Sequence, residues 1–140
     1  MIRIVICCSG GFSSSALAQH LENEVQEKNL DASFVFRPFI AMKDYEEEWD
    51  IAMLCPHLQS EARAIGKMGF GKPMYYIPPR MYGLMNAECF MEDAEDIVNI
   101  WNAQETHDSD IIGFPDEPMP LRIRRMTSHR RWIDAQNAGK

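Results

Sequence analysis

A cysteine followed by two glycines and a group of serines is the segment of this sequence best suited to chemistry. The segment begins at Cys8, and it continues with Ser9, Gly10, Gly11, Phe12, Ser13, Ser14 and Ser15. Two glycines let the backbone turn tightly, so that successive N–H groups can point at one centre. The serine hydroxyls add further hydrogen-bond donors. The segment is therefore suited to bind an anion such as phosphate.

The place of Cys8 at the start of this segment favours its thiolate form. A helix that starts within the segment contributes unpaired N–H groups and a partial positive charge. A thiolate beside a bound phosphoryl group can attack phosphorus and form phosphocysteine. A purely structural turn with an incidental cysteine is the alternative. The segment matches neither the pattern G-x-x-x-x-G-K-[ST], because no Lys follows the glycines, nor the dinucleotide pattern G-x-G-x-x-G.

Apolar runs and helical patterns alternate along the rest of the chain. They predict strands at 2–7, 32–36, 50–54 and 73–77, and helices at 13–28, 58–68 and 81–101. The strand segments are almost continuously apolar, as expected for strands that are buried on both faces. We therefore expect an α/β fold: a single three-layer domain with a four-stranded parallel sheet. In such a sheet the ligand site lies beyond the carboxyl ends of the strands, where the loops 8–13, 55–57 and 78–82 would meet.

Single residues mark the ends and the solvated faces of these predicted helices. Ser13 or Ser14 could cap the first helix, and Asn29 would end it. The acidic residues of the last predicted helix are expected to form its solvated face, namely Glu92, Asp93, Glu95 and Asp96. The first turns of that helix, around Gly83, could be loop instead.

Charge is distributed unevenly along the 140 residues. The formal net charge is −7; residues 1–120 carry 8 basic and 20 acidic side chains, whereas residues 121–140 carry 6 basic and 1 acidic. An acidic body argues against nucleic acid as a partner. The basic end could contact the acidic body itself. Alternatively, Trp132 with Arg130 and Arg131 could bind a partner or an anionic membrane surface.

The length and the composition predict one domain with an extension. Residues 1–101 hold the alternating pattern, and residues 102–140 form the extension. Its first part, residues 102–120, contains three prolines and no regular spacing of apolar residues. Such a composition is typical of a linker or of an arm that lies along the protein surface. Residues 121–134 are basic and could form a short amphipathic helix.

Nothing in the sequence predicts a leader peptide, a membrane span, a metal site or a cofactor. The first strand reaches the glycines too early for a signal peptide, and no apolar run approaches about 18 residues. We therefore expect a cytoplasmic protein with reduced cysteines. Cys7 and Cys89 are expected in the core. Cys55 is expected to fill space in a loop, or to be a redox neighbour of Cys8 if the two loops touch.

The segment that starts at Cys8 resembles the phosphorylation loop of a known family. The segment follows the pattern strand-C-S-x-G-x-S-[ST]-S-helix. This pattern is similar to the active loop of the lactose/cellobiose-type IIB components of bacterial phosphotransferase systems. The matching residues are Cys8, Ser9, Gly11, Ser13, Ser14 and Ser15. The similarity continues in residues 50–57, D-I-A-M-L-C-P-H, which correspond to D-V-V-L-L-G-P-Q in the family. Two further matches are Lys72-Pro73 and Met81-Tyr82-Gly83, of which the second is similar to L-Y-G. It covers about residues 1–101.

The resemblance implies a phosphocarrier. In that family the cysteine takes phosphate from a histidine of the IIA protein and gives it to a sugar held by the membrane IIC component. The sugar would be of the β-glucoside or disaccharide class, and the protein would sit at the membrane when docked on IIC. By the same resemblance, Cys55, Pro56, His57 and Tyr82 are possible neighbours of the site. Cys55 stands where a Gly is usual, and His57 where a Gln is usual. His57 could assist the transfer or simply be exposed.

Two other functions are compatible with the same fold. One is a regulatory or interaction module that binds an anion without transferring a phosphoryl group. The other is a phosphatase, because the family resembles the low-molecular-weight tyrosine phosphatases in fold. Those enzymes use C-x-x-x-x-x-R, in which the Arg binds the phosphoryl oxygens, but here that position is Ser14. Without that Arg, hydrolysis of a phosphocysteine should be slow, which suits a carrier.

Overall fold

Four apolar segments form one parallel sheet in the computed structural model of the chain. The described residues are 2–8, 12–38, 47–55, 72–84, 86–105, 112–114 and 125–138. The strands are β1 (Ile2–Cys8), β2 (Ala32–Pro38), β3 (Ile51–Leu54) and β4 (Met74–Tyr76). Their order in the sheet is β2-β1-β3-β4, and all neighbouring pairs are parallel. The predicted α/β fold is therefore confirmed, and each strand lies within two residues of its predicted bounds.

Helix α1 (Phe12–Lys28) connects β1 to β2 and ends in a left-handed turn. Asn29 has φ 55°, and the Leu30 N–H donates to the Val25 carbonyl at 3.0 Å. This is the pattern of a Schellman C-cap, in which Asn tolerates the left-handed conformation. Asn29 thus ends the helix as predicted. The predicted caps Ser13 and Ser14 are wrong, because the helix begins at Phe12 and both serines lie inside its first turn.

The helix predicted over 81–101 is in fact two helices. They are α3 (Pro79–Leu84) and α4 (Ala87–Ala103). Asn86 separates them: its backbone is extended, and its side-chain oxygen accepts the Cys89 N–H at 3.1 Å. An Asn at this position satisfies one of the unpaired N–H groups of a new helix, so the chain restarts there. The loop predicted at 78–82 is correspondingly wrong, since α3 already begins at Pro79. The helix predicted at 58–68 lies outside the described residues.

Both faces of the sheet are buried. On one face, α1 and α4 share a core with the alternate strand residues Ile4, Ile6, Ile51, Met53 and Tyr75. On the other face, Val5, Cys7, Ala52, Leu54 and Met74 are buried together with Trp49. Strand residues alternate between the faces, so burial on both explains why the strands are continuously apolar in sequence. Within the described ranges, no helix combines the length and the apolar character that a membrane span requires.

A fully buried ion pair joins the C-terminal segment to the sheet and to α4. Arg125 Nη1 donates to both carboxylate oxygens of Asp93, at 3.0 and 3.2 Å, and both side chains are 0% exposed. The Tyr75 hydroxyl of β4 donates to Asp93 Oδ2 at 3.1 Å and accepts Arg125 Nη2 at 2.6 Å. The His129 N–H donates to Asp93 Oδ1 at 2.8 Å. Burial raises the pKa of Asp93, whereas the Arg125 charge and these hydrogen bonds act in the opposite direction.

Aromatic rings and one backbone hydrogen bond complete this junction. Phe114 stacks on the His129 ring, with ring centroids 3.9 Å apart, and meets the Tyr75 ring edge-on at 5.9 Å. Next to it, the Ile112 N–H donates to the Met74 carbonyl of β4 at 2.9 Å. Residues 112–114 therefore run beside the outer edge of the sheet and contribute to its core.

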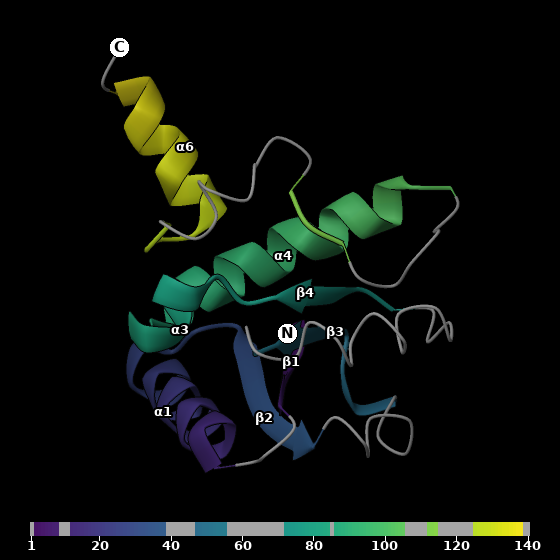
Figure 1. The fold of residues 1–140 in the computed structure, drawn as a ribbon, viewed down its shortest axis with the longest axis vertical. Coiled ribbons are helices and arrows are strands. Elements are labelled where there is room, and N and C mark those ends of the chain that lie inside the picture. Colours follow the sequence, from purple (N-terminus) through teal and green to yellow (C-terminus); the bar gives the residue numbers. More distant parts are fainter. Residues whose placement is uncertain are drawn as a thin grey trace.

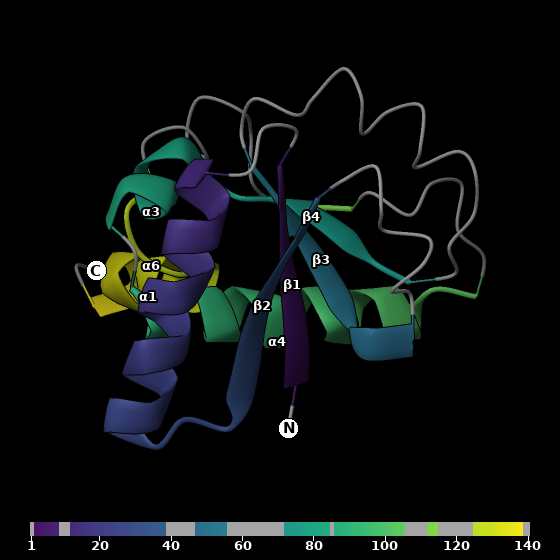
Figure 2. The same ribbon diagram turned by 90° about the horizontal axis from the view of Figure 1, so that it is seen from below.

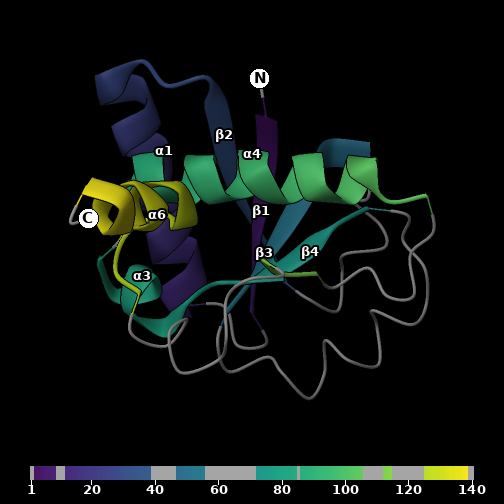
Figure 3. The same ribbon diagram turned by 90° about the horizontal axis from the view of Figure 1, so that it is seen from above.

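The last helix, α6 (His129–Ala138), lies on the side of α4 that faces away from β4 (Figures 1 and 3). Arg131 binds Glu88 at 2.9 Å and Glu92 at 2.8 Å, and Arg130 binds Asp96 at 2.8 Å. The predicted solvated face of α4 is therefore wrong. Its acidic side chains form the surface on which the basic C-terminal segment docks, and one of them, Asp93, is buried. Of the alternatives for the basic end, contact with its own acidic body is the one found.

These ion pairs change the titration of two carboxyl groups. Hydrogen bonds from Lys28 and from Arg131 hold the pKa of Glu88 below its ordinary value. Burial raises the pKa of Glu92, but hydrogen bonds from Arg131 and Ser128 outweigh it, so that the net pKa is lowered. A carboxylate whose pKa is lowered on folding adds stability at pH values above its unfolded pKa. This stability is lost as the pH falls through the folded pKa.

We expect Arg125→Met to destabilise the protein strongly. The substitution leaves the Asp93 carboxylate buried without its cation, a change that typically costs about 3–5 kcal/mol. Urea unfolding followed by circular dichroism measures the loss. The control is Arg3→Ala, which removes an ion pair with Asp50 whose side chains are 47% and 37% exposed. That pair should contribute far less, because solvent screens it. If Arg125→Met and Arg3→Ala lost the same free energy of unfolding, the buried pair would contribute no more to stability than an exposed one.

We also expect the contribution of Arg131 to stability to depend on pH. The difference in unfolding free energy between the wild type and Arg131→Gln should be present at pH 6 to 7. It should shrink as the pH falls below about 4, because Glu88 and Glu92 become protonated. Urea titrations at a series of pH values measure this difference. Arg80→Gln is the control, since Arg80 contacts the Met126 sulfur. If the difference in unfolding free energy between the wild type and Arg131→Gln did not change with pH, the ion pairs of Arg131 with Glu88 and Glu92 would not be its source.

Candidate functional site

Cys8 is the last residue of β1, at the carboxyl edge of a central strand. It is aligned with Pro38 of β2, and Cys7 before it is aligned with Leu54 of β3. The Cys55 N–H donates to the Cys7 carbonyl at 3.0 Å, which is the last hydrogen bond of the Cys7–Leu54 pair at the end of β3. The carboxyl ends of β1, β2 and β3 are therefore level with one another. This is the edge at which open parallel sheets bind their ligands.

Helix α1 starts only four positions after Cys8, at Phe12. The start of α1 and the carboxyl end of β1 lie at the same end of the sheet, opposite the N-terminus of the chain (Figure 2). The backbone of Cys8 thus lies close to a helix N-terminus, where unpaired N–H groups and the helix dipole favour an anion. The predicted residues Ser13, Ser14 and Ser15 belong to the first turn of this helix. The predicted residues Ser9, Gly10 and Gly11 lie outside the described residues.

Two of the predicted neighbours of the site are at the same edge of the sheet. Cys55 is fully buried directly after β3, in the cluster that contains Cys7 and Leu54. Tyr82 is half-buried on α3 and packs against the cores on both faces. The Ile77 N–H donates to the Leu54 carbonyl at 2.9 Å, which brings the start of α3 to this edge. The other two predicted neighbours, Pro56 and His57, lie outside the described residues.

Cys7, Cys55 and Cys89, the cysteines whose side chains the structure describes, are buried thiols. Cys7 and Cys89 are in the core, as predicted, and Cys55 is buried as well. Burial raises the pKa of the Cys89 thiol, which keeps it protonated at neutral pH. Within the described ranges, no group of three or more His, Cys, Asp or Glu side chains is arranged to hold a metal ion.

The C-terminal segment reaches α3, which the sequence pattern did not indicate. Arg125 Nη1 lies 3.6 Å from the Met81 sulfur, and Arg80 Nη1 lies 3.8 Å from the Met126 sulfur. Residues 125–126 therefore pack against α3, the helix that carries Tyr82. A signal did exist in the sequence: Asp93 shares the apolar stripe of α4, because it lies three residues after Phe90 and four before Ile97. An acid in such a stripe predicts a buried basic partner.

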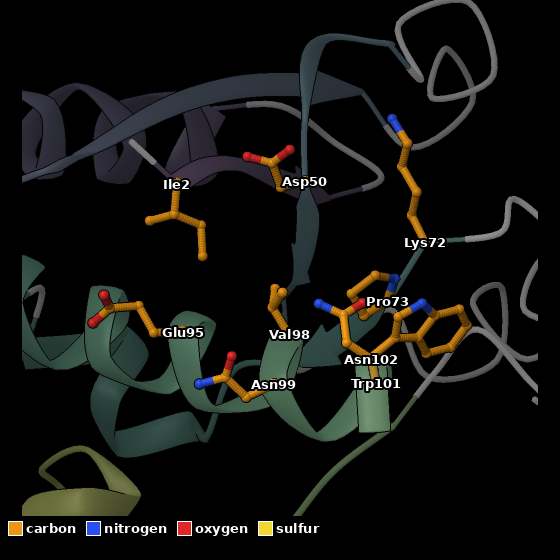
Figure 4. A pocket seen from close by; sticks show the side chains of 9 residues that line it. All are labelled: Ile2, Asp50, Lys72, Pro73, Glu95, Val98, Asn99, Trp101 and Asn102. Atoms are coloured by element: carbon orange, nitrogen blue, oxygen red, sulfur yellow. The ribbon is translucent and has the colours of Figure 1, made fainter. Parts of the chain in front are cut away.

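A cavity of about 510 Å³ lies at the opposite end of the sheet (Figure 4). It is lined by the start of β1, by residues that precede β3 and β4, and by the last turns of α4; these are Ile2, Asp50, Lys72, Pro73, Glu95, Val98, Asn99, Trp101 and Asn102. Two of its charged groups already bind within the protein. Asp50 pairs with Arg3 at 2.9 Å, and Lys72 Nζ donates to the Trp49 carbonyl at 2.9 Å. The full length of β1 separates this cavity from Cys8, because Ile2 and Cys8 are the two ends of that strand.

The comparisons with known proteins agree with this geometry. Residues 3–93, more than half of the chain, match the family described as PTS system, lactose/cellobiose-specific IIB subunit. The cellobiose-specific phosphotransferase IIB component protein from Borrelia burgdorferi is 25% identical, with a TM-score of 0.57, over 71% of this chain and 93% of that chain. The fold is shared by the lactose-specific IIB component domain of the phosphoenolpyruvate:carbohydrate phosphotransferase system from Streptococcus pneumoniae. That domain is 13% identical, with a TM-score of 0.52, over 75% of this chain and 98% of that chain. No curated protein matches the chain. From the family match and the parallel sheet with Cys8 at its carboxyl edge, we conclude that this chain belongs to the lactose/cellobiose-specific IIB family of the sugar phosphotransferase system.

Proposed function

We propose that the chain carries a phosphoryl group on Cys8, accepts it from a phosphohistidine of a IIA protein, and passes it to a sugar. The observation that carries the proposal is the position of Cys8 at the carboxyl edge of β1, four residues before the start of α1, in a chain of the IIB family. Family membership supports a phosphotransferase role in general. The phosphocysteine and its two partners are our assignment for this chain.

The reaction consists of two displacements at phosphorus. In the first, the Cys8 thiolate attacks the phosphoryl group of the IIA histidine; the S–P bond forms, the N–P bond breaks, and the imidazole leaves. In the second, a sugar hydroxyl attacks the phosphocysteine; the O–P bond forms, the S–P bond breaks, and the hydroxyl proton passes to a base or to solvent. Cys8 returns as a thiolate, so that the carrier is regenerated.

Backbone N–H groups stabilise the charge on the transferring group. We assign this role to residues 9–14, since the first turn of α1 has unpaired N–H groups beside Cys8. The hydroxyls of Ser9, Ser13, Ser14 and Ser15 are further donors in the proposal. The absence of an Arg at position 14 separates this loop from a phosphatase loop, since no guanidinium binds the oxygens while water attacks. The phosphocysteine is then long-lived enough to reach an acceptor.

Partner docking takes place around the same edge of the sheet. Tyr82 on α3, together with Pro56 and His57 after Cys55, is assigned to the rim that the IIA and IIC proteins contact. The sugar, of the β-glucoside or disaccharide class, is held by the membrane IIC component. In this proposal the chain works in the cytoplasm and reaches the membrane only by docking on IIC.

We expect Cys8→Ser to abolish phosphorylation by the donor chain. Phosphoenolpyruvate, the general phosphotransferase proteins and a matched IIA should add about 80 Da, one phosphoryl group, to the wild type. Intact-mass spectrometry measures this gain, which should disappear in Cys8→Ser. The control is Cys7→Ala, which changes the adjacent buried cysteine and should keep the gain.

The donor chain itself must be shown to be active, for example with another IIB protein. If IIA is active and the wild type gains no phosphoryl group, the carrier function is refuted. The better explanation is then that the chain is an anion-binding interaction module on the same fold. Continuous release of inorganic phosphate without an acceptor would favour a phosphatase instead.

We expect Cys8 to be the thiol that is alkylated first in the native protein. Cys7, Cys55 and Cys89 are buried, and burial raises the pKa of Cys89, so these thiols should react slowly with iodoacetamide. Peptide mapping after a short exposure at pH 7 measures the labelling of each residue. Inorganic phosphate should slow the reaction of Cys8, because it occupies the proposed cradle. Equal labelling of all four cysteines in the native protein would contradict the proposed reactivity of Cys8.

A further inference from the structure

The backbone of β2 has one side that faces away from the rest of the sheet, because β2 is an outer strand. In a parallel strand, the N–H and C=O groups of every second residue point to the same neighbour. The Asp31 carbonyl accepts the Ile2 N–H of β1 at 3.3 Å, so the odd-numbered residues that follow Asp31 in β2 also face β1. The outer edge of β2 is therefore formed by the backbone of residues 32, 34, 36 and 38.

Helix α1 lies beside this edge and places a carboxylate on it (Figure 1). Glu22 Oε2 accepts the Phe34 N–H at 2.7 Å. Such a short distance is typical of a hydrogen bond whose acceptor is charged. Phe34 shares a core with Leu21 of α1, which keeps the helix and the strand together. Because Glu22 already binds the Phe34 N–H, this group cannot donate to an added strand.

Arg37 and Pro38 modify the next two positions of the outer edge. Arg37 Nη1 donates to the Phe36 carbonyl at 3.0 Å. The same guanidinium donates to Glu48 Oε2 from Nε at 3.2 Å and from Nη2 at 3.0 Å, which holds it in place. Pro38 has no N–H to offer to a further strand. The outer edge of β2 is thus altered at residues 34, 36 and 38, at each in a different way.

The opposite edge of the sheet, at β4, is covered by main chain. The Pro73 carbonyl accepts the Ala52 N–H of β3 at 3.1 Å, so residue 73 faces inward and residue 74 faces outward. The outward Met74 carbonyl accepts the Ile112 N–H at 2.9 Å. The chain therefore covers β4 with a segment of its own backbone, whereas it covers the outer edge of β2 with side chains.

We propose that the outer edge of β2 is a self-association surface that Glu22 and Arg37 keep closed. When it is open, the β2 strand of a second copy of this chain pairs with it. An outer strand with accessible N–H and C=O groups is a template for a strand of another molecule. A second copy fits because the same strand can pair with itself about a two-fold axis, which satisfies both edges at once. Val35, in the middle of β2, is 41% exposed, and the added strand would cover its apolar surface.

Hydrogen exchange of the Phe34 amide tests the contact with Glu22. In dilute protein, this amide should exchange about tenfold faster or more in Glu22→Ala, because a hydrogen bond to a charged acceptor is lost. Glu22→Gln should exchange more slowly than Glu22→Ala, since its amide oxygen can still accept the N–H. The control is Glu24→Ala, which removes pairs with His20 and Lys28 on the same helix and should leave the Phe34 amide unchanged. Equal exchange in the wild type and Glu22→Ala would refute the contact.

Sedimentation velocity over a wide range of concentration tests the closure. The full-length wild type, Glu24→Ala and Glu22→Gln should not associate through β2. Glu22→Ala with Arg37→Ala should form a dimer whose share rises with concentration. In that dimer the outward-facing amides of β2, at residues 32, 34 and 36, should become protected from exchange as the concentration rises, which places the interface at β2.

Three results would overturn the proposal. The first is a double variant that stays monomeric up to about 1 mM. The second is a dimer in which the amides of β2 gain no protection. The third is a Glu22→Gln variant that associates as strongly as Glu22→Ala, since charge alone would then keep the copies apart. Circular dichroism checks that each variant is folded, and Glu22→Ala alone carries the test if the double variant does not fold. None of these measurements depends on phosphotransfer.

Discussion

The buried pair between Arg125 and Asp93 is the interaction that holds the separate parts of this structure together. A charge that is removed from water is tolerated only with a partner and with its hydrogen bonds satisfied. Asp93 lies on α4, Tyr75 on β4 and Arg125 in the C-terminal segment, and all three meet within hydrogen-bonding distance. The sheet, the helix that covers it and the last part of the chain therefore have to occupy their places together. The exposed pairs of α6 add to this docking, but they do not replace it, because solvent screens them.

The parallel alignment of the strands brings the chemistry to one place. Residues far apart in sequence, Cys8, Cys55 and Tyr82, belong to the same edge because three neighbouring strands end level with one another there. The same edge holds the start of α1, whose N–H groups favour a phosphoryl group.

The C-terminal segment connects the two regions. Through Arg125 and Met126 it contacts Met81 and Arg80 of α3, the helix that follows β4 at the edge of the site. The pair with Asp93 therefore also supports the position of α3. A loss of that pair would release both the docked helix α6 and one wall of the region that partners are proposed to contact.

Local patterns in the sequence determined the elements, their order and the candidate nucleophile. Continuous apolar runs predicted strands buried on both faces, Asn29 predicted the end of α1, and the residues from Cys8 to Ser15 indicated a phosphate loop, which stays a prediction. The break at Asn86 and the burial of Asp93 were not predicted. The place of Asp93 in the apolar stripe of α4 was a signal for a buried basic partner, but the pattern of one helix does not reveal which distant segment supplies it. Only the tertiary structure decided that Asp93 is a core residue, that the basic end docks on α4, and that the carboxyl ends of β1 and β3 are level. The physical reason is that burial of a charge and alignment of strands are properties of pairs of residues that lie far apart in sequence. Asp93 and Arg125 are 32 residues apart, and the paired strand residues Cys7 and Leu54 are nearly 50 apart.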